Sequence, residues 1–322
     1  KKKEIKNEMQ VKIKMLSDLA ENIAGQEISS EQVKATIKLL DEGNTIPFIS
    51  RYRKENTGDL DEKEIRSIKK KVDYLRKLNE KKQEVINLID ERGELTEELK
   101  EKIKQASVLQ EVKDLYRPYK KKRKTRATRA KEKGLKTLAE LMWKQKIKSG
   151  NLNEIVEDYI NTDVDVDSVD EAIQGVKDII SEWISDNAEY RKWIREITYN
   201  KGKIHSICKN KEKDEQGKYK IYYGYKETVR EIPPYRILAL NRGEKEKILR
   251  AKITAPKKKI YSYLIRENVN KSFLFSEQII QAVKNSYNRL IAPSIERELR
   301  KKLTEKAEKH PLDIFGKNLR AL

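Results

Sequence analysis

The sequence has little of what most enzymes use for chemistry. Its 322 residues include one cysteine, Cys208, and two histidines, His205 and His310. A single cysteine excludes an intrachain disulfide and favours a reducing compartment, and one cysteine with two histidines does not make a zinc pattern. The chain has no P-loop and no Gly-x-Gly-x-x-Gly motif. We therefore expect a protein that is not an enzyme and that carries no cofactor.

Long apolar runs are also missing. No run approaches 18 apolar residues, so we expect no membrane span, and the basic start is followed by acids rather than by the apolar core of a signal peptide. The acidic run from Asp163 to Glu171 does not fit a calcium loop, because Ser168 would occupy the position that needs glycine. These absences lead us to expect a cytoplasmic protein without a metal site.

Positive charge is what the sequence has in excess. Lysine and arginine number 73 against 53 acids, a formal net charge of +20, and 39% of residues are charged, compared with about 25% in ordinary soluble domains. A summed field of this size attracts polyanions. Simple solubility would explain the same excess.

Apolar periodicity predicts helices over most of the chain. Capping boxes begin helices at Ser29 and Asp61, and the second helix is expected to run for about 30 residues before Gly93, as a spine for shorter helices. Thr96 begins a short helix. Between the first two helices, Thr45 to Gly58 reads as a connector punctuated by Pro47.

The second half mixes helices with short strands. Ser168 opens an amphipathic helix, Asp186 is expected to cap the next one, and the chain is helical again from Ser276. Alternation predicts strands in "KYKIYYGY" (218–225) and "KILRAKI" (247–253), with a turn at 241–243 between them, although the aromatic-rich first segment could equally be a helix. Two strands alone are marginal, so they would need a neighbour to pack against.

The expected fold is mainly α: a multi-helix scaffold with a long spine helix, a helix–turn–helix-like element and a few short β-strands. The helix–turn–helix-like element is predicted from the spacing of Ala130, Gly134, Leu135 and Leu138, although a plain helical hairpin explains it equally well. We place a helical domain at 1–200 and a mixed, mostly helical region at 201–322.

The clearest candidate site is the basic segment, Arg117–Lys133, in which ten cations face one acid, Glu132. Tyr116 and Tyr119 flank its start, where aromatic rings beside cations suit stacking on unpaired bases. Pairing with the acids of 154–171, or a protein partner, would account for the same charge. The candidate phosphate-binding residues are Arg117, Lys120, Lys121, Lys122, Arg123, Lys124, Arg126, Arg129 and Lys131.

A smaller basic cluster comprises Arg51, Arg53 and Lys54 beside Tyr52. We include these three cations among the candidate nucleic-acid contacts. Salt bridges to Glu55, Asp59 or Asp61 are the competing explanation.

Four long stretches resemble the bacterial Tex family, the RNA-binding transcription accessory factors. They are "IPFISRYRKENTGDLDEKEIRSI" (46–68), "DLYRPYKKKRKTRATRAKEKGL" (114–135), "YYGYKETVREIPPYRILALNRGEKE" (222–246) and "ERELRKKLTEKAE" (296–308). The match is colinear over essentially the whole chain.

The resemblance implies a cytoplasmic transcription factor related to the eukaryotic Spt-type elongation factors. It implies that this chain is an N-terminal region, and that the family continues into a ribonuclease-H-like domain, a helix–hairpin–helix pair and an OB-fold RNA-binding domain. No catalytic residue carries over. The expected partner is nucleic acid, RNA or DNA, bound through phosphates without sequence specificity. The alternative is a protein-interaction module that docks on RNA polymerase or another transcription factor, with nucleic acid bound only by the family's later domains.

Overall fold

The computed structural model describes residues 28–318, with side chains up to Glu308. Its contacts group the chain into two compact units, an N-terminal unit up to Lys113 and a C-terminal unit from Asp114. The expected domain boundary at residue 200 stays a prediction. Within residues 28–318, no helix is long and apolar enough to cross a membrane.

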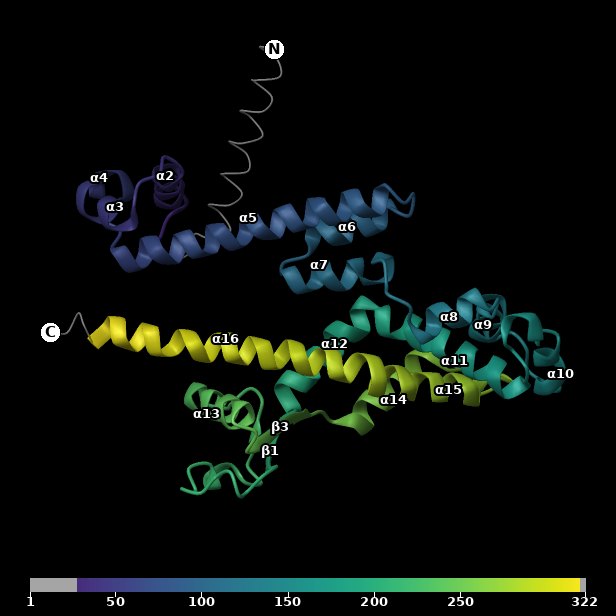
Figure 1. Ribbon diagram of the computed structural model, residues 1–322. Coiled ribbons are helices and arrows are strands. Elements are labelled where there is room, and N and C mark those ends of the chain that lie inside the picture. Colours follow the sequence, from purple (N-terminus) through teal and green to yellow (C-terminus); the bar gives the residue numbers. More distant parts are fainter. Residues whose placement is uncertain (1–27, 319–322) are drawn as a thin grey trace, which may run out of the picture. The chain divides into compact units, whose positions relative to one another are not determined.

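The N-terminal unit is built on the predicted spine helix (Figure 1). Asp61 and Glu64 form the predicted capping box at its start, and Ser29 and Gln32 form the other. The helices of this unit are α2 (Ser30–Asp41), α3 (Ile46–Tyr52), α4 (Lys54–Thr57), the 29-residue spine α5 (Glu62–Asp90), α6 (Glu97–Gln105) and α7 (Leu109–Tyr116), which reaches into the second unit.

The expected connector at 45–58 is instead mostly helical. Thr45 accepts a hydrogen bond from the backbone N–H of Phe48, and Pro47 sits in the first turn, where its missing N–H costs nothing. Gly58 ends α4 in the left-handed conformation, at φ +63°. Pro47 and Gly58 do mark boundaries in the chain, as expected, but they are the boundaries of short helices rather than of a loop.

The C-terminal unit is organised around α11 (Val169–Asp186). Five shorter helices pack around it: α8 (Arg126–Glu132), α9 (Lys136–Lys144), α10 (Leu152–Glu157), α14 (Lys257–Asn268) and α15 (Ser276–Asn285) (Figure 1). The remaining helices of this unit are α12 (Ala188–Lys201), α13 (Pro234–Lys245) and α16 (Ala292–Asn318).

Helices α8 and α11 cross closely because both present small residues. A Cβ added to Gly175 would lie 2.4 Å from Leu135 Cδ1 and 3.3 Å from Ala130 Cβ, and both neighbours are buried. Gly134 turns the chain between α8 and α9 at φ +84°, and no other residue lies within 4 Å of a Cβ placed there. Of the two small residues expected at a close crossing, Ala130 is used, against Gly175 of α11, which was not predicted. The DNA-reading role of a helix–turn–helix stays a prediction.

The strands form one small antiparallel sheet of order β2–β1–β3. Strand β3 (Leu249–Thr254) was expected, but β1 (Lys203–Cys208) and β2 (Lys226–Thr228) were not. The strand predicted at 218–225 is absent, and the alternative of a helix is met only by a three-residue 3-10 helix, Lys220–Tyr222. Tyr219 and Tyr222 are buried against the sheet.

The expected turn at 241–243 is also wrong, because these residues lie inside α13. Gly243 is there for close approach rather than for a turn. A Cβ at this position would come within 2.6 Å of Leu249 Cδ1 and 3.1 Å of Tyr219 Cδ1, so glycine lets α13 pack directly on the sheet.

Helix α16 links two hydrophobic cores. Ile295 and Leu299 belong to the core around α11, and Leu303 and Ala307 belong to the core between α13 and the sheet. A π-helical segment, 286–291, joins α15 to α16 without a break. This continuous rod fixes the sheet relative to the helices around α11.

A buried ion network closes the middle of the C-terminal unit. Arg191 of α12 is 0% exposed, and its guanidinium donates to Asp114 at 3.0 Å and to Glu298 of α16 at 2.8 Å. Arg195 completes the ring, donating to the same two carboxylates at 2.6 and 2.9 Å. The network joins the end of α7 to α12 and α16.

Replacing Arg191 with methionine should destabilise the C-terminal unit by about 3–5 kcal/mol, because the buried carboxylate of Asp114 would lose the charge of Arg191. Urea unfolding followed by circular dichroism would measure this. Arg297→Met is the matched control: Arg297 is exposed on α16 and should change stability by less than about 0.5 kcal/mol. Equal effects of the two changes would contradict a structural role for the network.

Candidate nucleic-acid interface

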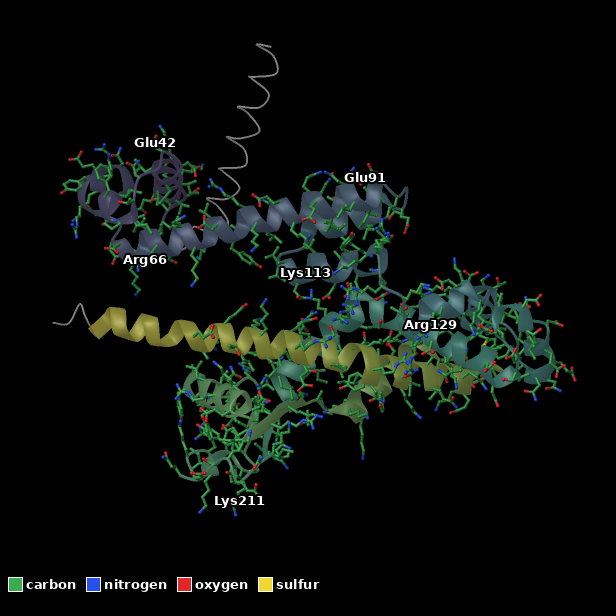
Figure 2. All side chains as sticks on the ribbon, in the orientation of Figure 1. Glu42, Arg66, Glu91, Lys113, Arg129 and Lys211 are labelled. Carbon is green, nitrogen blue, oxygen red and sulfur yellow. The ribbon has the colours of Figure 1, made fainter. Side chains whose placement is uncertain are left out.

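The basic segment begins where α7 ends. A 3-10 turn, Arg117–Tyr119, contains Pro118 and ends the helix, an irregular stretch follows, and Thr125 then caps α8 by accepting a hydrogen bond from the backbone N–H of Thr128. The segment therefore presents its cations from a loop held between two short helices. In Figure 2, Arg129 marks its position on α8, while Lys211 lies at a different end of the same unit.

A row of carboxylates on α11 faces this segment. Asp178, Glu182 and Asp186 are spaced four residues apart, which places them on one face of the helix, and all three are buried. We call them the acidic row. Their spacing is visible in the sequence, but only the fold shows which cations they meet.

Three of the candidate cations pair with the acidic row. Lys131 Nζ lies 2.8 Å from Glu182 Oε1, Lys122 bridges Glu182 and Asp186, and Arg117 Nε lies 3.3 Å from Asp186 Oδ1. Internal pairing was thus a correct alternative for part of the segment, although the acids expected at 154–171 were the wrong ones. The expectation that Asp186 caps α12 was wrong, because Asn187 is the N-cap residue. The carboxylate of Asp186 instead pairs with Lys122 and Arg117.

Burial has different net effects on the pKa values of Glu182 and Asp186. At Glu182 burial opposes ionisation, but Lys131 and Lys122 outweigh it and lower the pKa of the carboxyl below its usual value. At Asp186 burial prevails and raises the pKa despite Lys122 and Arg117. Burial, with the nearby charge of Arg191, also lowers the pKa of Arg117. The ion pairs between the basic segment and the acidic row are therefore largely shielded from water.

The other six candidate cations remain exposed. None of the ion pairs in the described part of the chain involves them, so their charge is available to an outside anion. They are Lys120, Lys121, Arg123, Lys124, Arg126 and Arg129. We call these six the exposed cations.

A cavity of about 690 Å³ lies between the basic segment and α11. Seven cations and three carboxylates line it, which leaves a positive excess. One of those cations, Arg289, was not predicted: it comes from the π-helical segment and donates to Asp178 at 2.7 Å. No local sequence signal marks Arg289, because its role depends on a contact 111 residues away.

The smaller cluster lies in the N-terminal unit. Arg51, Arg53 and Lys54 are exposed, and no ion pair with Glu55, Asp59 or Asp61 is found among the described residues, so the expected salt bridges do not account for it. Arg53 instead lies over the ring of Phe48, at 5.3 Å, and Phe48 contacts Tyr52 with ring centroids 5.4 Å apart. Tyr52 is 67% exposed.

Comparison with known families assigns the chain. Residues 14–90 match the Tex-like protein N-terminal domain, and residues 148–315, more than half of the chain, match the Tex central region. The chain belongs to the Tex family. The resemblance noted in the sequence is thereby confirmed, and the basic segment lies between the two matched regions of this Tex chain.

Relatives of this Tex chain occur in bacteria and animals. An uncharacterized protein of Bacillus subtilis, YdcI, is 46% identical over 92% of the chain; the transcriptional accessory protein Tex of Neisseria gonorrhoeae is 31% identical over 93%. The human S1 RNA-binding domain-containing protein 1 is 31% identical over 89%. The chain spans 41%, 40% and 30% of these three proteins.

Glu182→Gln should destabilise the C-terminal unit by about 1–3 kcal/mol at neutral pH, because Lys122 and Lys131 lose their shared charged partner. A carboxyl whose pKa is lowered by folding stabilises the fold above its unfolded pKa, near 4.3, and this contribution disappears as the pH falls through the folded value. The difference from the unchanged protein should therefore shrink below about pH 4.

Thermal unfolding between pH 3 and pH 8 would measure this. Glu132→Gln removes an equal charge at an exposed position of the same segment and should have little effect at any pH. A destabilisation by Glu182→Gln that is independent of pH would contradict the ionic role of Glu182.

Proposed function

We propose that this chain is the N-terminal and central scaffold of a Tex-type transcription accessory protein, and that its basic segment binds the phosphates of nucleic acid. The observation that supports this most directly is the division within the segment. Three cations are held by the acidic row, and the six exposed cations have no carboxylate partner among the described residues.

The paired cations give the exposed ones a fixed position. Lys122 is anchored on α11, and its neighbours Lys121 and Arg123 are exposed at the rim of the same cavity. A loop that is already tied down loses less conformational entropy when a ligand binds. The exposed arginines add planar forks that match phosphate geometry.

Binding of this kind would not depend on sequence. Phosphate contacts set position and register, while base edges carry sequence information, and the exposed cations are simple charges on a surface. The names of the gonococcal and human relatives, a transcriptional accessory protein and an S1 RNA-binding protein, support RNA or DNA as the ligand class. We further propose that the chain acts without catalysis and in the cytoplasm.

Docking on RNA polymerase or another transcription factor is a second candidate, favoured by the smaller cluster. Phe48 and Tyr52 are 36% and 67% exposed, beside Arg51 and Arg53. Exposed aromatics with arginine are typical of protein interfaces. This candidate would use the N-terminal unit and does not need the exposed cations.

Changing all six exposed cations to glutamine should weaken binding to single-stranded RNA and flatten its salt dependence. Each lost phosphate contact reduces the log–log slope by about 0.7 on a single strand and about 0.9 on a DNA duplex. Titration of labelled RNA and duplex DNA across salt, with the full chain, would measure both slopes and show which ligand is preferred.

The matched control removes three lysines and three arginines that are exposed elsewhere in the same unit: Lys211, Lys213, Lys226, Arg230, Arg242 and Arg250. Its net charge equals that of the test variant, so a general field effect would weaken both alike. Equal losses would sink the proposal of a localized interface, and a loss confined to the test variant would support it. If neither variant changes nucleic-acid binding, the basic segment is not the interface, and docking on a protein partner becomes the favoured function.

A further inference from the structure

A second basic groove lies in the C-terminal unit, between α12 and α14, away from the basic segment in sequence. It encloses about 660 Å³. Its lining combines cations with a pair of aromatic rings and contains no carboxylate. The lining residues are Trp193, Ile197, Lys201, Lys258, Lys259, Ser262, Tyr263 and Arg266.

The lysines of this groove are not neutralised by the protein. Lys201, Lys258 and Lys259 are exposed, and no ion pair of residues 28–308 involves them. Arg266 differs, because it pairs with the adjacent Glu267 at 2.9 Å. The groove thus offers three unpaired positive charges from the end of one helix and the start of another.

The position of two of these lysines is unfavourable for the fold. Lys258 and Lys259 lie in the first turn of α14, which contains no acid. The helix dipole stabilises anions and destabilises cations there, by a few tenths of a kcal/mol each. Departures from a local rule without a structural gain are expected at functional sites.

Aromatic rings form the wall beside these charges. Trp193 and Tyr263 stack with centroids 4.0 Å apart at 25°, and Tyr190 meets Tyr263 edge-on at 5.9 Å. Both rings of the stacked pair are only half-buried. Arg266 lies over the ring of Tyr263, at 5.6 Å from its centroid, so Tyr263 is contacted by Trp193, Tyr190 and Arg266. The ring of Trp193 is therefore the member of the stacked pair considered for contact with a ligand.

We propose that the α12–α14 groove binds single-stranded nucleic acid, with phosphates at Lys201, Lys258 and Lys259 and a base against the ring of Trp193, which Tyr263 supports from behind. The proposal extends the proposed nucleic-acid function to a second site with its own residues. Proteins that bind single strands without sequence preference combine cations, which contact the phosphates, with aromatic side chains, on which the bases stack. A duplex would keep its base faces covered, and an acidic peptide would use the charges but not the rings.

The fluorescence of Trp193 provides the test. Oligouridylate of about 12 nucleotides, within the length such grooves cover, should quench it, and Trp193→Phe identifies its share among the chain's three tryptophans. The triple change of Lys201, Lys258 and Lys259 to glutamine should abolish this quenching. It should also reduce the slope of the logarithm of the binding constant against the logarithm of the salt concentration by about 2, which corresponds to three lost phosphate contacts. Oligothymidylate of equal length shows whether RNA or DNA is preferred.

The matched control changes Lys211, Lys213 and Lys226 to glutamine, which removes the same charge from exposed sites outside the groove. The proposal is supported if quenching is lost in the groove variant but survives in this control and in the sixfold variant of the basic segment. That result would also show that the groove binds independently of the basic segment. Full quenching in the groove variant would overturn the proposal. So would polyglutamate that competes as well as oligouridylate, or duplex DNA that quenches equally.

Discussion

The burial of one guanidinium, that of Arg191, constrains the whole C-terminal unit. A charge with no access to water has to be met by carboxylates in fixed geometry, and here Asp114 and Glu298 meet it. Three segments distant in sequence are tied together in this way. Asp114 lies three residues before Arg117, so the network also fixes the point from which the basic segment departs, and the charge of Arg191 reaches Arg117 itself.

Helix α11 uses its two faces for different purposes. Ile179, Ile180 and Ile184 fill the core, while the acidic row meets the basic segment. Because the row neutralises only part of the facing charge, the cations separate into anchors and exposed groups. A segment of uniformly exposed cations would repel itself and remain mobile, whereas an anchored one can keep its unpaired charges in a constant arrangement.

The two basic surfaces of the C-terminal unit are built on different physical principles. The basic segment is backed by carboxylates, so its positive excess is set by the balance of charges. The α12–α14 groove has no carboxylate in its lining and is backed by stacked aromatic rings. The first arrangement is an excess of cations over the carboxylates behind them, and the second combines cations with an aromatic surface.

Local signals in the sequence determined much of this protein by themselves. The capping boxes at Ser29 and Asp61, the long spine helix and the family were all predicted correctly, because each depends on residues close together in the chain. Tertiary structure alone decided which cations are anchored, that Gly243 belongs inside a helix, and that Tyr219 and Tyr222 are buried in a turn. It also brought Trp193, Tyr263 and three lysines into one groove. Those outcomes depend on contacts between residues far apart in sequence, whose partners no local pattern can specify.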